Sequence, residues 1–367
     1  MSPLNQRRIA NFKANKRGYW SLRIFLVLFV VSLFAGFVAN NRPLVMSYKG
    51  HLMFPALFDY SEDTFGGFEA TTDYLDPSIA EEINAHGWMV WPPLRYANDT
   101  AELAPLTPLP SPPTWRATPE LCAAWAKEHP AIAGAPANGC AKLNTMVLGA
   151  DVNGHDVLAR LIYGFRISTL FGLTLALVSS VVGVAAGAVQ GYFGGWTDLI
   201  FQRFIEIWSS LPSLYILIIL SSFLPPGFLV LLTIQLLFSW VSLVHVVRAE
   251  FLRARNFEYV NAARALGLSN FRIIVKHVLP NAMVATITFL PFIVSSSIGA
   301  LTALDYLGLG MPPGSPSLGE LLYEGKSNLN APWLALSAFF TIAGMLTLLV
   351  FIGEAVRDAF DPRKAVL

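Results

Sequence analysis

Asp151, Asn153 and Asp156 are the side chains whose spacing comes nearest to a metal site, because they place oxygen ligands close together in one segment. A calcium-binding EF-hand loop also requires a glycine at its sixth position and a glutamate at its twelfth. Counted from Asp151, the sixth position is Asp156 and the twelfth is Ile162. We therefore predict no metal site in this segment.

Sequence motifs of enzymes are also missing from the chain. It contains no G-x-x-x-x-G-K-[ST] loop for nucleotide phosphates, no H-E-x-x-H and no G-x-S-x-G. We predict that the chain is not an enzyme and binds no cofactor itself, and we expect no nucleic-acid partner. If the protein moves a solute uphill, the energy must come from an ion gradient or from a partner protein.

The composition is that of an integral membrane protein. The 367 residues are 54% hydrophobic and 13% charged, whereas soluble domains are about 25% charged. The charges are clustered, which leaves five long uncharged intervals: 24–41, 167–197, 207–247, 278–304 and 327–353. Each interval is long enough to cross a bilayer, for which about 20 residues suffice.

The third uncharged interval contains Pro225, Pro226 and Gly227 near its middle. These residues break helices, so we divide the interval into two crossings joined by a tight turn. The predicted fold is therefore an all-α polytopic membrane protein with six transmembrane helices. The first crossing is residues 24–40, and helices two to six lie in residues 166–367.

The distribution of Lys and Arg predicts the orientation of the chain in the membrane. Residues 1–23 carry six basic side chains and no acidic one, which places the N-terminus in the cytoplasm. We prefer an uncleaved first helix to a signal peptide, because the apolar run is long and lacks an A-x-A cleavage site. Six crossings return the C-terminus to the cytoplasm and make the basic loop 248–280 cytoplasmic as well.

Residues 41–165 then form a lobe on the outer side, between helices one and two. This lobe is rich in proline, as in PLTPLPSPPTW, and we expect it to be rich in loops. Both cysteines, Cys122 and Cys140, fall in this lobe. In an oxidising compartment they favour one structural disulfide, with two free thiols as the alternative.

Two patterns around the second predicted crossing indicate packing. The apolar residues of 157–162 suggest a helix on the membrane surface, with Arg160 and Arg166 directed towards lipid headgroups. Gly183, Gly187 and Gly191 recur at four-residue spacing, which lets transmembrane helices approach closely. We interpret the glycines as a packing face, with substrate contact as the alternative.

The basic loop from Asn256 to Asn281 reads as two short helices. Asn256 is placed to cap the first, which Gly267 ends; Ser269 is placed to cap the second, which we expect to end at Pro280. One face of the first helix carries Tyr259, Ala262, Ala263 and Leu266. This face is narrow and small in the middle, and the loop is the candidate place where an energy-supplying partner would attach.

This loop resembles the cytoplasmic loop of the permease subunits of ATP-binding-cassette (ABC) importers, in the dipeptide and oligopeptide branch. The match is NAARALG at 261–267 followed by Leu279 and Pro280; Asn261 stands in place of the usual Glu and His277 in place of the usual Ile. The resemblance extends to GADVNGHDVLARLIYGFRIS, SLGELL (317–322) and FIGEAVRDAFDPR (351–363). The N-terminal start and the WPPLRY segment are most similar to one particular subunit type of peptide importers.

The resemblance implies a permease that couples closure of a separate ATPase to alternating access for peptides or peptide-like solutes. The implied partners are a second, different permease subunit, a cytoplasmic ABC ATPase that holds ATP and Mg, a periplasmic substrate-binding protein and the lipid of a bacterial inner membrane. The outer lobe would then be periplasmic. The residues implied to couple to the ATPase are Glu258, Tyr259, Asn261, Ala262, Ala263, Leu266 and Gly267.

Two other classes of function remain open. A gradient-driven secondary transporter is disfavoured, because the helices lack buried acids or bases and show no inverted repeat. A non-transporting scaffold subunit of a membrane complex is the other alternative. Uptake that collapses with an uncoupler at constant ATP would indicate the first, and absence of any substrate dependence would indicate the second.

Overall fold

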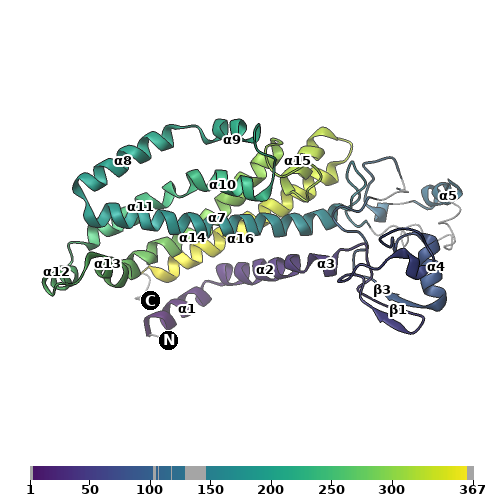
Figure 1. Cartoon of the computed structure of the whole chain (residues 1–367), viewed down its shortest axis with the longest axis horizontal. Coiled ribbons are helices and arrows are strands. Elements are labelled where there is room, and N and C mark those ends of the chain that lie inside the picture. Colours follow the sequence, from purple (N-terminus) through teal and green to yellow (C-terminus); the bar gives the residue numbers. More distant parts are fainter. Residues whose placement is uncertain (1–2, 102–104, 106, 117, 129–145, 362–367) are drawn as a thin grey trace. The chain divides into compact units, whose positions relative to one another are not determined.

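The chain is mostly helical in the computed structural model, which describes residues 3–101, 105, 107–116, 118–128 and 146–361 (Figure 1). Within this part, four helices are long and apolar enough to cross a membrane, or five if one bent pair counts as a single span. This confirms a helical, multi-pass membrane protein. The number six stays a prediction.

The chain divides into two compact units. We call Met1–Val27, Ser168–Pro312 and Ala343–Leu367 the core unit, and Leu28–Ile167 with Pro313–Ile342 the lobe unit. Three helices have residues in both units: α2 (Lys16–Leu33), α7 (Val157–Phe193) and α16 (Pro332–Phe360).

The rest of the core unit consists of helices and one π-helical turn, labelled in Figure 1 where there is room. In chain order they are α1 (Pro3–Ala14), α8 (Gly195–Ser210), α9 (Ser213–Ser221), α10 (Phe228–Ser239), α11 (Val241–Ala254), α12 (Glu258–Ala265), α13 (Asn270–Ile273), the π-helical turn η3 (Ile274–Val278) and α14 (Leu279–Tyr306).

Two breaks interrupt the long apolar stretch after α7. The predicted break at Pro225, Pro226 and Gly227 is confirmed, because α9 ends at Ser221 and α10 begins at Phe228. A second break, which the sequence analysis missed, separates α8 from α9 with a bend of 66°. Pro212 explains it, since a residue before proline avoids the helical region, and Leu211 is extended with ψ 121°.

The glycine row of α7 packs against α11, as the four-residue spacing predicted. A Cβ atom added at Gly183 would lie 2.7 Å from the carbonyl oxygen of Trp240, and one at Gly187 would lie 2.9 Å from that of Val244. At Gly191 the nearest atoms are the Cβ of Phe251 at 2.5 Å and the carbonyl oxygen of Arg248 at 2.6 Å. The two helix backbones are therefore in direct contact over about two turns of α7.

The lobe unit contains a small antiparallel sheet with strand order β2-β1-β3, which the prediction of a loop-rich lobe did not include. Its elements are α3 (Ala35–Val38), β1 (Val45–Tyr48), β2 (His51–Met53), the 3-10 helix η1 (Glu62–Phe65), α4 (Pro77–His86), β3 (Gly87–Val90), the 3-10 helix η2 (Thr114–Arg116), α5 (Pro119–Glu128) and α15 (Leu318–Ser327). In the register, Met46 pairs with Met53 on one side and Met89 on the other.

Alternate residues of β1 build the core of this sheet. Met46 and Tyr48 point to the same side and pack with Phe65, Ile79 and Ile83. Asp76 begins α4, where its side chain accepts a hydrogen bond from the Ser78 amide. The predicted disulfide is not tested, because Cys122 lies on α5 but Cys140 lies outside the described residues.

The prediction that Arg160 is directed towards lipid headgroups is wrong, because its side chain is fully buried in the lobe unit. The guanidinium donates to Asp151 Oδ2, to Glu324 Oε1 at 2.7 Å and to Glu320 Oε2 at 3.0 Å. It joins the turn before α7 to α15 through three carboxylates. No surface helix forms here, since residues 157–193 are one continuous helix.

The turn before α7 also holds two carboxylates with opposite protonation behaviour. Burial raises the pKa of Asp151, but the hydrogen bond from His155 and the charge of Arg160 outweigh burial and hold that pKa below its usual value. Asp156 is buried without such a partner, and burial raises its pKa to about 7 despite hydrogen bonds from the amides of Ala159 and Leu158. The hydrogen bond to Asp151 raises the pKa of His155.

We predict that Gly191→Leu destabilises the core unit by at least about 1–3 kcal/mol, because the added side chain must push α11 away from α7. The matched control is Gly344→Leu on α16, where no atom lies within 4 Å of an added Cβ. Thermal unfolding of the purified protein in detergent measures the difference. Equal unfolding temperatures for the two variants would contradict direct backbone contact between α7 and α11.

We also predict that raising the pH from 6 to 8 destabilises the protein through Asp156. Its folded pKa of about 7 lies above the usual value of 3.8, so its stabilising contribution is complete below the unfolded pKa and is lost as pH rises through 7. Asp156→Asn should reduce the loss by about 1 kcal/mol, because the amide stays neutral.

Thermal unfolding at both pH values measures this effect. Asp73→Asn is the control. Like Asp156, Asp73 accepts a hydrogen bond from the backbone amide two residues later in the chain, that of Leu75, but the Asp73 side chain is exposed. A pH dependence that is the same in wild type and Asp156→Asn would show that Asp156 is ionised throughout.

Candidate functional site

The first helix of the loop between α11 and α14 ends before Gly267, as the sequence predicted. Helix α12 spans Glu258–Ala265, and Gly267 follows in the left-handed region with φ +76°. Its amide donates to the carbonyl of Arg264, and the amide of Leu268 donates to that of Ala263. A glycine is favoured at this position because other residues are strained at positive φ.

The predicted caps of the two short helices do not form as expected. The cap position of α12 is Phe257 instead of Asn256, and Ser269 precedes α13 without a side-chain cap hydrogen bond. Pro280 does not end the second helix either. It lies in the first turn of α14, where the missing amide of proline is tolerated.

The π-helical turn at Ile274–Val278 explains how the chain passes Pro280 without a break. In this turn the amide of Leu279 donates to the carbonyl of Ile274, five residues back. Residues Asn270–Tyr306 consequently count as one candidate membrane span. Turns of this kind occur often at functional positions of helices.

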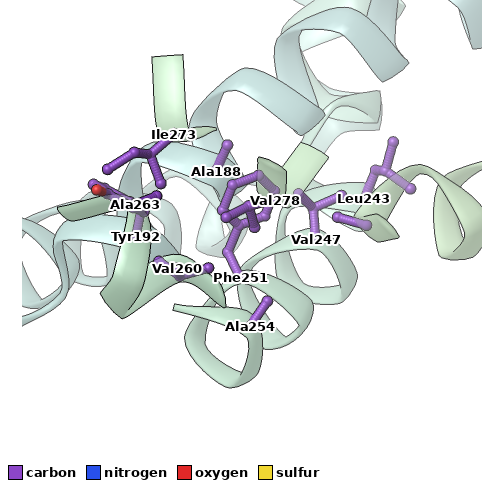
Figure 2. Packing of buried hydrophobic residues seen from close by; sticks show 11 residues of the cluster. Ala188, Tyr192, Leu243, Val247, Phe251, Ala254, Val260, Ala263, Ile273 and Val278 are labelled. Carbon is purple, nitrogen blue, oxygen red and sulfur yellow. The ribbon is translucent and has the colours of Figure 1, made fainter. Parts of the chain in front are cut away.

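The inner face of α12 is packed against the helices of the core unit. Val260 is fully buried and Ala263 is 5% exposed; both join a cluster with residues of α7, α11 and α13 (Figure 2). The cluster comprises Ala188, Tyr192, Leu243, Val247, Phe251, Ala254, Val260, Ala263, Ile273, Val278 and Ala282. The predicted face of Tyr259, Ala262, Ala263 and Leu266 is thus divided, because Ala263 points inward.

The other predicted coupling residues are exposed. Leu266 is 81% exposed, and Glu258, Tyr259, Asn261, Ala262 and Gly267 are exposed as well. Two of them have a polar link inside the protein. The side-chain amide of Asn281 donates to the hydroxyl of Tyr259 at 3.2 Å, and that of Asn261 donates to the carbonyl of Asn256 at 3.4 Å. Leu266 directly follows α12, and an exposed apolar patch, as opposed to a single exposed residue, marks a contact with another protein.

The sequence analysis missed a second exposed area beside Leu266. A hollow of about 580 Å³ is lined by Ser269, Phe271, Arg272, Val275, Lys276 and Pro280. Phe271 is 77% exposed. The hollow therefore combines apolar surface with two positive charges. The sequence contains these aromatic and basic residues, but no pattern in it indicates that they line a common hollow.

Tyr192 is a further residue that the sequence analysis did not single out. It is buried near the end of α7, and its hydroxyl donates to Asn270 Oδ1 at 2.9 Å. The guanidinium of Arg264 lies 5.2 Å from the centre of its ring. Tyr192 therefore contacts both short helices of the loop.

An ion pair ties the same end of the core unit together. The guanidinium of Arg248 on α11 donates to both carboxylate oxygens of Asp198 on α8, at 2.5 and 2.6 Å. A bidentate pair of this kind fixes orientation as well as distance. Helix α8 is thereby held to α11 close to the point where α11 leads into the loop.

Comparison with known proteins agrees with this arrangement. Residues 179–366 match the family described as binding-protein-dependent transport system inner membrane component. The match covers α12 and α13, together with the C-terminal part of α7 and all of α14 and α16.

Relatives extend the similarity to the whole chain. The chain is 60% identical to the peptidoglycan transport system permease protein YejE of Agrobacterium fabrum, over 99% of this chain and 94% of the relative. It is 54% identical to the inner membrane ABC transporter permease protein YejE of Escherichia coli, over 100% and 99%. The oligopeptide transport system permease protein OppC of Haemophilus influenzae is 36% identical over 59% of this chain and 70% of that protein.

These matches confirm the resemblance that the loop motif indicated, and the subunit type that the N-terminal start and WPPLRY suggested is the YejE type. The chain belongs to the family of binding-protein-dependent transport system inner membrane components, and it is a permease subunit of an ABC importer.

Proposed function

We propose that this permease imports peptides or peptide-like solutes, and that α12 is the element through which a separate cytoplasmic ATPase drives it. One observation carries this proposal: α12 is buried on one side, at Val260 and Ala263, and exposes Ala262 on the other, with Leu266 exposed directly after the helix. A helix fixed to its own bundle on one face can transmit a push that it receives on the other.

The contact with the ATPase is a helix lying in a groove. Leu266 and the adjoining hollow at Phe271, Arg272 and Lys276 supply an apolar centre with a positively charged edge. Ala262 is exposed and small, which allows a groove wall to approach closely. The role of Ala263 differs from the one that the sequence suggested, because it seats α12 on the bundle.

The remaining partners and the topology belong to the same proposal. Six crossings place the N-terminus, the C-terminus and the loop 248–280 in the cytoplasm, and residues 41–165 in the periplasm. ATP and Mg bind to the ATPase, a second and different permease completes the membrane part, and a periplasmic binding protein delivers the solute. The support is the charge distribution of the chain and its family membership.

The class of solute follows from the relatives. One is named a peptidoglycan transport system permease and another an oligopeptide transport system permease. Both names refer to compounds with peptide bonds, so short peptides and peptide-bearing fragments of cell wall are the first solutes to test. Stimulation of ATP hydrolysis in the purified complex by such compounds, with the binding protein present, is the direct test.

We predict that Leu266→Glu lowers the amount of ATPase that co-purifies with the permease by about tenfold or more, because a charge replaces an apolar side chain at the centre of the contact. Leu329→Glu is the matched control, since Leu329 is 84% exposed in the lobe unit between α15 and α16. Quantitative mass spectrometry of the purified complex measures retention. Equal retention in both variants would rule out docking at Leu266.

We predict that Gly267→Val lowers transport while membrane insertion stays normal. An added Cβ atom at Gly267 meets no atom within 4 Å, so the main cost is backbone strain of about 1–2 kcal/mol at φ +76°, which changes the angle between α12 and α13. That strain lowers the ratio of correctly folded to misfolded loop by about 5- to 30-fold.

Gly66→Val provides the control for this experiment. Gly66 has φ +90° and equally open surroundings, but it lies in the lobe unit. Uptake of a labelled peptide by cells that contain equal amounts of each variant gives the comparison. Normal uptake with Gly267→Val would show that the geometry of this turn does not matter for coupling.

A further inference from the structure

Tyr192 is placed where a long membrane helix meets the loop that receives the ATPase. It is the residue before the last of α7, and it is buried in the cluster that also contains Val260 and Ala263 of α12 and Ile273 of α13 (Figure 2). The chain connects this loop directly to α11 and to α14, but not to α7. Any movement shared by the loop and α7 must therefore pass through side-chain contacts.

The contacts of Tyr192 reach both short helices of the loop. Its hydroxyl donates to Asn270 Oδ1 at 2.9 Å, at the first residue of α13. Its ring lies under the guanidinium of Arg264 on α12, 5.2 Å from the ring centre. The hydrogen bond has a direction, so it opposes sliding of α13 along the end of α7 in a way that apolar packing alone does not.

Helix α7 is also held to α11. The glycine row of α7 lies in direct contact with the backbone of α11, from Gly183 to Gly191. Helix α7 therefore cannot slide along α11 without a steric clash. With Tyr192 as the second attachment, α7, α11, α12 and α13 are joined at every interface.

We infer that Tyr192 is a positioning residue that makes α7 move together with α12 and α13 when the ATPase displaces the loop. This inference rests on the proposed docking of an ATPase at α12. The hydroxyl of Tyr192 holds α13, its ring holds α12, and the glycine row transfers the displacement along α7. The push is thus shared between three membrane helices instead of the two that the chain connects to the loop.

The test measures whether α7 and α12 keep their separation during the ATPase cycle. Spin labels are attached to cysteines at Ala185 on α7 and Ala265 on α12, which are both exposed. The chain carries Cys122→Ser and Cys140→Ser, and the full complex with its ATPase is reconstituted in lipid. Electron paramagnetic resonance records the label distance without nucleotide and after trapping with ATP and vanadate.

In the wild-type sequence we expect one distance that nucleotide does not change. In Tyr192→Phe, which keeps the ring and loses only the hydroxyl, we expect a second distance population after trapping. Loss of one such hydrogen bond shifts the balance between attached and detached forms by about 2- to 10-fold. A distance that changes with nucleotide in the wild type, or a single unchanged distance in Tyr192→Phe, would overturn the inference.

Two further variants separate positioning from simple loss of stability. Tyr163→Phe on the same helix removes a hydroxyl that donates to the Ala39 carbonyl at 3.0 Å, in the lobe unit, and should leave the label distance unchanged. Asn270→Ala should reproduce Tyr192→Phe, and the double variant should be no worse than either one, because both changes remove the same hydrogen bond. Additive effects would count against the inference.

The failure of this inference differs from failure of the proposed function. If Leu266→Glu retains its ATPase as fully as Leu329→Glu, the docking site itself is wrong. If Leu266→Glu loses the ATPase while Tyr192→Phe keeps a single label distance, docking stands and only the role of Tyr192 is excluded.

Discussion

The direct contact between α7 and α11 is the constraint on which the core unit depends. Within a bilayer, helix association gains little from the hydrophobic effect, so it relies on close packing and polar contacts. Three glycines on α7 provide that packing, and each faces backbone atoms of α11 or of Trp240 directly before it. Helix α11 then leads into α12, so the position of the exposed Leu266 is set by an interface deep among the membrane helices.

The lobe unit is held together by a buried cluster of charged side chains. Arg160 is fully buried, and such a charge is tolerated only with close partners of opposite charge. Asp151, Glu320 and Glu324 supply them, and they join two segments that are far apart in the sequence. The excess of acidic groups over the guanidinium is eased because burial raises the pKa of Asp156 to about 7, and the hydrogen bond to Asp151 raises the pKa of His155.

Much of this organisation could be predicted from the sequence where the signal was local. Charge-free intervals predicted the four helices that, in the described part of the chain, are long and apolar enough to cross a membrane, and glycine spacing predicted the packing face. Gly267 was correctly predicted to end α12. The predictions failed where tertiary contacts determine the position of a side chain. The buried position of Arg160 was missed because two of its three carboxylate partners lie more than 150 residues away in the sequence. Likewise, Ala263 and Ala262 are the same residue type, and only packing shows which one is buried.

The π-helical turn at Ile274–Val278 has a consequence for the direction in which the loop faces. A π turn holds one more residue than an α turn, and each residue of an α-helix turns the chain by about 100°. Removing that extra residue would rotate α13 by about this angle around the axis of α14. Phe271 and Arg272 would then point to a different side of the protein while every membrane helix kept its place. One inserted residue thus sets the direction in which the surface around Phe271 and Arg272 faces.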